Sequence, residues 1–426
     1  MAEVIPFKGV LYNPQKVDAD IVMAPPYDIV TPESKEVLYK KSPHNIVRID
    51  FGRDEDGDSE NENRYTRASK FFGGWLKKGI LINDSAPAFY CYEITYRING
   101  QKKKLRGFLG AVKIEELGSG RIHPHEMTYS KPKSDRLNIL RYCRANTSPI
   151  FSIYSSRKKR ASSILSETVK SKPFIEAKNG EGFVHRLWRI SNTASINAVR
   201  EEMSDKDIFI ADGHHRYETS LRFKNEIDKI TLNAQRSTLN AKPWDYTLMF
   251  LANMEAEGLT LLPTHRIVEV DSNINIHDAL KNYFDIQKTS FKGSTGQQAR
   301  RKMFEIMRKQ PHCFGMFLTN ANTYYTLSFN RSKMGIALPA CLKNLDVTVL
   351  HKLIFGNLLK IEHYEYEIGP EAAVEKAKKG SFEAVFFLNP TKIEDVKKVA
   401  LAGERMPPKS TYFYPKLLTG MVIYKF

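Results

Sequence analysis

Apolar and polar positions follow strand-like spacing in several parts of the chain and helix-like spacing in others. Aromatic and β-branched residues fill positions 87–98 and 104–117 around Asn99–Gly100, which predicts two strands joined by a tight turn. Strands are also expected at Ile208–Ala211 and at Trp244–Asn253.

The N-terminal region mixes short apolar runs with helix signals. Ile21–Met23 and Asn45–Phe51 are predicted as strands, and Thr31 before a proline is typical of a helix start. The acidic stretch Asp54–Asp58 is interpreted as a hydrated loop, because its glycine is misplaced for a calcium loop and no closing glutamate follows. A helix at about 60–79 is expected after it.

The remaining segments combine strands and helices without strict alternation. Ser134 is expected to cap a helix that runs to Arg144, and two helices are expected to flank a strand near 183–190. After Asp271 the pattern predicts helix, strand, helix, strand and strand over 275–330. The last predicted elements are a helix at Leu345–Leu359, a strand at 383–388, a helix at 392–402 and a strand at Gly420–Phe426.

This mixture predicts an α+β or mixed α/β fold. A chain of 426 residues is too long for one small domain. We expect a main mixed α/β domain over 1–270, a smaller α+β module over 271–345, and a C-terminal segment over 346–426 that returns to the main domain.

The formal net charge of +17 favours anionic ligands in general. The basic residues lie in scattered runs, such as 101–104 and 376–379, so a solvated face explains them as well as a nucleic acid does. Four cysteines without a Cys-x-x-Cys pair fit a reducing compartment. No apolar run approaches about 18 residues and no signal sequence is recognised, so we expect a cytoplasmic protein without a membrane span.

The densest group of reactive residues follows the strand predicted at Ile208–Ala211. The chain turns at Gly213, and helical spacing begins directly after it. Helix N-termini carry free N–H groups and a partial positive charge, so this turn is predicted to bind the phosphates of a nucleotide. Its carboxylates are candidates for catalysis, and a plain surface turn is the alternative. The residues concerned are Asp212, Gly213, His214, His215, Arg216 and Glu218.

A second group contains His123, His125 and Glu126. An extended segment places both imidazoles on one face, a spacing that a metal ion could use. Phosphate contact by the histidines, with Glu126 as general base or magnesium ligand, is a second interpretation. A polar loop without chemistry is the third.

A third group lies near the C-terminus, where prolines on both sides hold a run of lysine, hydroxyl and aromatic side chains. Lysine and hydroxyl groups neutralise phosphate charge and donate hydrogen bonds to it. A strand-like segment with aromatic packing is the alternative. A further basic segment lies at a predicted strand near residue 265. The candidate ligands in these two segments are Lys409, Ser410, Thr411, Lys416, Thr264, His265 and Arg266.

Several common motifs are missing from the sequence. It has no P-loop, no Rossmann glycine pattern and no Gly-x-Ser-x-Gly motif. A nucleotide would therefore bind through a less common architecture.

Several short motifs, in order along essentially the whole chain, resemble a widespread prokaryotic family known as domain of unknown function 1015. This resemblance implies family membership and little about activity. The motifs are Pro25–Asp28, His125–Glu126 with Asp135–Arg136, Ser148–Ile150, Ala211–Glu218, Leu262–Arg266 and Lys409–Lys416.

The turn itself resembles the phosphate-binding motif of the ParB/sulfiredoxin superfamily, which includes a free-serine kinase. The resemblance implies a ParB/sulfiredoxin-like nucleotide-binding core, with the smaller module inserted or appended. In that core Gly213 would allow close backbone approach, while His215 and Arg216 would grip phosphates. Position 214 is a histidine where sulfiredoxin has its cysteine, so the resemblance does not imply peroxiredoxin repair.

Together these features predict a phosphotransferase that uses ATP or ADP, with Mg²⁺, to act on a small hydroxyl metabolite such as a serine-like compound. Its expected partners are the nucleotide and that substrate, with no membrane. The alternative is a nucleotide-binding regulatory protein that contacts nucleic acid and transfers no phosphate.

Overall fold

The computed structural model describes residues 2–128, 130–233, 241–290, 293–333, 335 and 337–426, in two compact units. The first unit comprises Met1–Pro124, Thr128–Thr260 and Pro415–Phe426, and the second comprises His125–Met127 and Leu261–Tyr414. Contacts therefore group residues 346–414 with the smaller unit, whereas the sequence pattern assigned them to the main domain.

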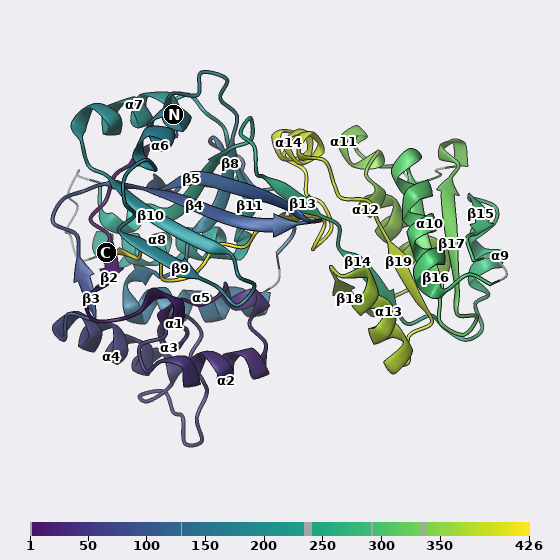
Figure 1. Cartoon of the computed structure of the whole chain (residues 1–426), viewed down its shortest axis with the longest axis horizontal. Helices are drawn as coiled ribbons and strands as arrows, with labels where there is room; N and C mark the ends of the chain where they lie inside the picture. The colour runs from purple at the N-terminus through teal and green to yellow at the C-terminus, as the bar shows by residue number, and fades with distance from the viewer. Residues whose placement is uncertain (1, 129, 234–240, 291–292, 334, 336) are drawn as a thin grey trace. The chain divides into compact units, whose positions relative to one another are not determined.

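A mixed sheet forms the centre of the first unit (Figure 1). Its strands are β1 (Val4–Ile5), β4 (Phe89–Ile98), β5 (Gln101–Lys113), β6 (Ile122–His123), β8 (Ile150–Tyr154), β9 (Ile175–Lys178), β10 (Val184–Ile190), β11 (Ile208–Asp212) and β12 (Tyr246–Asn253). They run in the order β6-β11-β8-β12-β5-β4-β10-β9, with β1 on β5. The pairs β11–β6 and β12–β8 are parallel, while the others are antiparallel. Two ribbons complete the unit: β2 (Val10–Tyr12) with β3 (Leu81–Asn83), and β7 (Ala145–Asn146) with β21 (Tyr424–Lys425).

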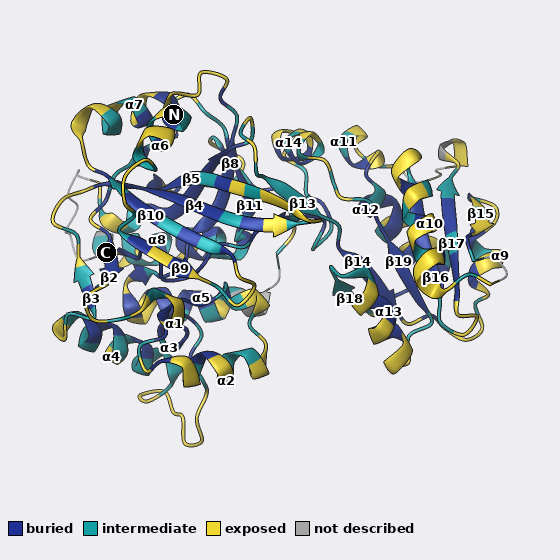
Figure 2. Ribbon diagram, viewed as in Figure 1, coloured by how far each residue is buried: buried dark blue, intermediate teal, exposed yellow. Residues whose placement is uncertain are grey.

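Helices surround this sheet, and Figure 2 shows the strands largely buried while the helices carry many exposed positions. Leu165, Val199 and Met203 from two helices pack with Ile208 and Leu251 of the sheet in one apolar core. The helices are α1 (Ala19–Val22), α2 (Pro32–Lys41), α3 (Val47–Asp50), α4 (Arg64–Lys77), α5 (Ser130–Cys143), α6 (Arg160–Thr168), α7 (Thr193–Met203) and α8 (His214–Asn233), with 3-10 turns η1 (Tyr27–Ile29) and η2 (Pro243–Asp245).

Two strands predicted in the N-terminal region are wrong, because these segments contain the short helices α1 and α3. A side chain accepts a backbone hydrogen bond at the start of each helix. Asp18 accepts the N–H of Asp20 at 2.9 Å before α1, and Asn45 accepts the N–H of Val47 at 3.0 Å before α3. A short apolar run does not distinguish a strand from a helical turn, so the local hydrogen bonds decide. Helix α5 begins at Ser130, so Ser134 is not its cap.

The second unit has an antiparallel sheet in the order β15-β17-β16-β19-β14-β18. Its strands are β14 (His265–Val268), β15 (Phe284–Lys288), β16 (Cys313–Leu318), β17 (Thr323–Phe329), β18 (Tyr364–Glu367) and β19 (Ala384–Phe387), and a ribbon joins β13 (Thr260–Leu262) to β20 (Tyr412–Tyr414). Its helices are α9 (Ile276–Leu280), α10 (Gly296–Lys309), α11 (Ala340–Lys343), α12 (Asp346–Thr348), α13 (Pro370–Lys379) and α14 (Ile393–Leu401), with the 3-10 turn η3 (Arg331–Lys333) and the π-helix η4 (Val349–Leu359).

The order helix, strand, helix, strand, strand predicted over 275–330 is confirmed by α9, β15, α10, β16 and β17. Met303 and Met307 of α10 pack against Phe317 and Phe387 of the sheet, so the unit has an apolar core of its own. The chain as a whole is mixed α and β. In the described part of the chain, no helix is long and apolar enough to cross a membrane.

Candidate functional site

The turn between β11 and α8 lies in the first unit and has the predicted strand–glycine–helix form. β11 is buried from Ile208 to Ala211 and ends at Asp212. The next residue, Gly213, has a φ of +94°, a backbone conformation that favours glycine. The carbonyl of Gly213 accepts the N–H of Tyr217 at 3.1 Å, so the helix begins directly after the glycine. A helix N-terminus there offers backbone N–H groups to an anion.

Arg216 folds back over this glycine. A Cβ on Gly213 would lie 2.8 Å from Arg216 Nε. The guanidinium of Arg216 donates to Asp212 Oδ2 at 3.2 Å, to Ser148 Oγ at 3.4 Å and to the carbonyl of Pro149. These contacts fix the guanidinium beside the start of the helix.

Lys416 brings a second cation to the same carboxylate. Its Nζ lies 3.2 Å from Asp212 Oδ1, so each oxygen of Asp212 has a cationic partner. The side chains of Arg216 and Lys416 are each 11% exposed. Charge interactions are stronger where water is largely excluded. Two candidates from distant sequence motifs therefore meet at one helix N-terminus.

A buried ion-pair network lies behind this turn. Arg136 Nη1 lies 3.1 Å from Asp50 Oδ1, and Arg136 Nε donates to Asp135 Oδ2 at 2.9 Å. Burial alone would lower the pKa of Arg136, but the carboxylates of Asp50 and Asp135 hold it above its ordinary value. Although burial opposes ionisation of Asp135, Arg136 and then Arg64 lower its pKa. The network therefore keeps its charges.

Tyr27 covers this network, with its ring centroid 4.1 Å from the guanidinium of Arg136. Burial, the largest effect, raises the pKa of Tyr27 to about 12, so its hydroxyl stays protonated at neutral pH. A cavity of about 30 Å³ is lined by both Arg136 and Arg216, together with Asp50 and Ser148. A water molecule needs about 10–15 Å³ of such space, so this polar cavity has room for ordered water.

Five residues of this region were not predicted from the sequence as site residues, namely Tyr27, Asp50, Asp135, Arg136 and Ser148. The available signal was the set of motifs shared with the family, which includes all of these residues except Asp50. Their place beside the turn follows from packing between segments that lie far apart in the chain.

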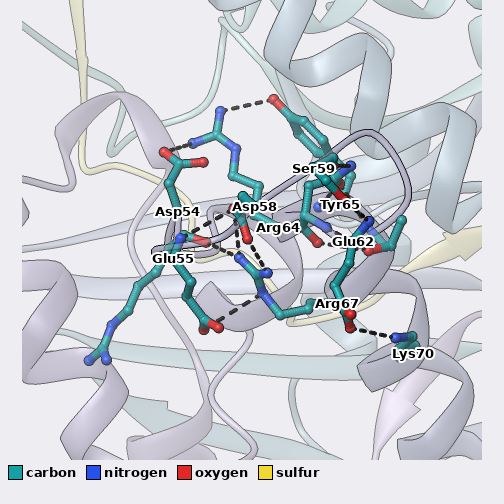
Figure 3. Close-up of polar contacts among 12 residues, drawn as sticks. Asp54, Glu55, Asp58, Ser59, Glu62, Arg64, Tyr65, Arg67 and Lys70 are labelled. Carbon is teal, nitrogen blue, oxygen red and sulfur yellow. Dashed lines mark hydrogen bonds and ion pairs between the residues drawn. The ribbon is translucent and has the colours of Figure 1, made fainter.

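Two arginines pair with carboxylates of the acidic loop at Asp54–Asp58 (Figure 3), and one of them also reaches the network. Arg67 pairs with Asp58 through two contacts, at 2.5 and 3.0 Å. Arg64 bridges Asp54 at 3.3 Å and Asp135 at 2.5 Å. Asp54 and Asp58 of the acidic loop are therefore each paired with an arginine.

His123 lies at the opposite end of β11 from the turn. It is paired with Phe209 in the strand register, and its Nε2 lies 3.0 Å from Asp207 Oδ1. Three residues of strand span roughly 10 Å, which separates His123 from Asp212. Glu218, in the first turns of α8, accepts hydrogen bonds from Thr128 Oγ1 and pairs with Lys133.

In the second unit, residues 125–127 are hydrogen-bonded to the 406–411 segment. His125 is fully buried, and its Nε2 lies 2.9 Å from Thr411 Oγ1. Glu126 Oε1 accepts the backbone N–H of Lys409 at 2.9 Å. Ser410 Oγ donates to the carbonyl of Pro407 at 2.6 Å. The second and third sequence groups thus contribute to one cluster in this unit.

The basic segment at the start of β14 is buried in the same unit. Arg266 is 1% exposed, donates to the carbonyl of Lys409 at 2.9 Å and donates from Nε to His351 Nε2 at 3.2 Å. Burial and then Arg266 lower the pKa of His265 to about 3, so this imidazole is neutral at neutral pH. Thr264 is also buried. These side chains are therefore part of the packed interior of the second unit.

In the described residues, no three His, Cys, Asp or Glu side chains gather as a metal site. The carboxylates of Asp212 and Glu218 are each paired with lysine or arginine. Mg²⁺ is usually bound by one or two carboxylates together with substrate phosphates.

The family model described as "Protein of unknown function (DUF1015)" matches residues 4–348 of the chain. No curated protein gave a match. Among solved structures, a free serine kinase variant in complex with AMP is 12% identical, with a TM-score of 0.35 over 71% of this chain and 89% of that one. A conserved hypothetical protein from Pyrococcus furiosus is 15% identical, with a TM-score of 0.33 over 69% and 87% of the two chains. SbnI from Staphylococcus aureus, truncated at its C-terminus, is 10% identical, with a TM-score of 0.36 over 73% and 85%. At these TM-scores the likenesses carry no argument about function.

Proposed function

The chain belongs to the DUF1015 family of proteins of unknown function, and we propose that it is a nucleotide-dependent phosphotransferase acting on a small hydroxyl metabolite. The observation that carries the proposal is the meeting of Arg216, Lys416 and the N-terminus of α8 around Asp212. Two largely buried cations beside the N-terminus of a helix suit a phosphate chain better than a neutral ligand.

In this proposal the phosphates of ATP or ADP lie over Gly213, where the missing side chain lets them approach the backbone. Arg216 and Lys416 neutralise charge that develops on the transferred group, and His214 and His215 supply further contacts. Asp212 orients both cations. Glu218 is the second candidate carboxylate in this unit. Magnesium would bridge phosphate oxygens when bound.

The candidates in the second unit stay predictions for ligand contact, and the proposal does not depend on them. They are His125, Glu126, Thr264, His265, Arg266, Lys409, Ser410 and Thr411. The ParB/sulfiredoxin-like character of the nucleotide-binding core is likewise part of the proposal.

The test is calorimetric binding of ATP and ADP with Mg²⁺, followed by phosphoryl transfer to a panel of hydroxyl compounds that includes serine. We expect Arg216→Ala and Lys416→Ala each to weaken nucleotide binding by about tenfold or more, because a charge-assisted contact contributes about 1.5–3 kcal/mol. Arg222→Ala is the control, since Arg222 lies on the same helix but is 61% exposed and pairs only with Glu226 in the described part of the chain.

No binding by the wild-type protein, or unchanged binding by both site variants with intact folding, contradicts the proposal. Binding without transfer to any acceptor would favour the regulatory alternative. In that case affinity for DNA or RNA that falls linearly with the logarithm of salt concentration would identify a nucleic-acid partner.

A further inference from the structure

A groove of about 650 Å³ lies in the second unit, and none of the candidate site residues named above lines it. It is lined by the end of α10 and the loop that follows, by the start of α12, and by the loop before α14. Its polar lining includes His312, Asn344, Asp346, Asn389, Thr391 and Lys392. Concave sites of this size with a few converging polar groups are typical places for small ligands.

A histidine–aspartate pair lies in this groove. His312 Nδ1 is 2.8 Å from Asp346 Oδ1, and the two side chains are 15% and 21% exposed. An aspartate on Nδ1 fixes the ring and leaves Nε2 for another partner. His312 has a φ of +54°, and its carbonyl accepts the N–H of Phe329 at 3.1 Å, so the backbone at this position is also held.

Three cations share the lining with this pair, namely Arg308, Lys309 and Lys392. All three are exposed, and within the described ranges none of them makes an ion pair. The carboxylate of Asp395 also lines the groove, and its Oδ1 lies 4.0 Å from Lys398. Positive charge therefore exceeds negative charge around His312, which favours an anion.

We propose that this groove is a second ligand site, which binds a small phosphate-bearing compound. A phosphate group has several acceptor oxygens and up to two negative charges, so it can use the three cations and His312 Nε2 together. A carboxylate has fewer acceptors for the same donors. The site is independent of the phosphotransferase proposal, because no residue at the Asp212 turn takes part.

The test is NMR of the full chain with ¹³C-labelled histidine, of which the sequence has eleven. His312→Gln identifies the His312 signal by its loss. Inorganic phosphate is titrated against chloride at constant pH and ionic strength, and succinate is titrated in parallel. We expect a saturable shift of the His312 signal with phosphate and a weaker, non-saturating response of the exposed His277.

Lys392→Ala and Arg308→Ala should each weaken this binding by about fivefold or more. Arg301→Ala should leave it unchanged, because Arg301 is an exposed residue of α10 that does not line the groove. Arg216→Ala should also leave it unchanged, which separates this site from the nucleotide site. A His312 signal that does not saturate, that responds equally to succinate, or that shifts equally in Lys392→Ala overturns the proposal.

Discussion

Gly213 is the residue on which the geometry of the turn depends most directly. Replacement by alanine meets two obstacles: a φ of +94° and a Cβ that would lie 2.8 Å from Arg216 Nε. We expect Gly213→Ala to lower the free energy of unfolding by about 1–3 kcal/mol and to displace Arg216, which would weaken nucleotide binding as well. Urea unfolding and calorimetry measure the two effects.

The matched control is Gly73→Ala, because Gly73 lies inside α4 and a Cβ there would meet nothing within 4 Å. Alanine is the better helix former, so this variant should gain about 0.5–1 kcal/mol. If Gly213→Ala is as stable as Gly73→Ala, the turn does not need the conformation described.

A second prediction concerns Arg136, whose side chain is 5% exposed and forms ion pairs with Asp50 and Asp135. Removing one partner leaves a buried charge unpaired, so Arg136→Met should lower the free energy of unfolding by about 3–5 kcal/mol. The exposed pair Lys170–Glu167 is the comparison, and Glu167→Ala should change stability by less than about 1 kcal/mol. Similar losses in both variants would rule out a special contribution from the network.

The residues of the turn could be proposed from sequence because they are contiguous and chemically unusual. Lys416 was also proposed as a phosphate ligand near this turn, but its ion pair with Asp212 could not be predicted because the two residues lie far apart in the chain. Asp50 carried no signal, since a single aspartate at the end of an apolar run has many ordinary explanations. Its role depends on Arg136, which lies 86 residues further along the chain.

At the scale of elements, long periodic segments were predictable and short ones were not. The β4–β5 hairpin and α8 follow from patterns of ten residues or more together with turn residues. The helices α1 and α3 have four residues each, too few for a period to be read. Their conformation is fixed by capping contacts and by burial of Val22 and Ile49, which the pattern alone does not contain.

Two buried histidines on β10 and β14, and the half-buried His351 on η4, are expected to make the stability of these elements depend on pH. Burial lowers the pKa of His185, His265 and His351 to about 3, with Arg266 as a further cause for the last two. The unfolded pKa is about 6.5, so the unfolded chain takes up protons first as pH falls. The contribution of these histidines to the free energy of unfolding should therefore be complete above about pH 6.5. It should be lost progressively as the pH falls toward 3.

Between pH 7 and 5.5 we expect the free energy of unfolding to fall by about 1 kcal/mol for each of these three histidines, measured by urea unfolding. His351→Gln keeps an acceptor for Arg266 Nε but removes a titrating group, so it should reduce this pH dependence. His277→Gln is the control, because His277 is exposed. A pH dependence that is the same in wild type and His351→Gln would contradict the assignment of His351 as a half-buried neutral acceptor.

At the scale of the whole molecule, the chain has separate apolar cores in its two units. Leu251 belongs to the core of the first unit and Phe317 to that of the second, and both are fully buried. All three tryptophans, Trp75, Trp188 and Trp244, lie in the first unit. Tryptophan fluorescence therefore reports on the first unit, whereas far-ultraviolet circular dichroism reports on both.

This distribution allows unfolding of the units to be separated. Phe317→Ala should destabilise the second unit by about 3–5 kcal/mol and shift part of the circular dichroism transition, while the fluorescence midpoint stays unchanged. Leu251→Ala should lower the fluorescence midpoint through a loss of about 2–5 kcal/mol. If the nucleotide binds at the Asp212 turn, ATP with Mg²⁺ should raise the fluorescence midpoint in both variants, because a ligand stabilises the unit that holds it. Equal shifts of both signals in every variant would mean that the two cores unfold as one cooperative body.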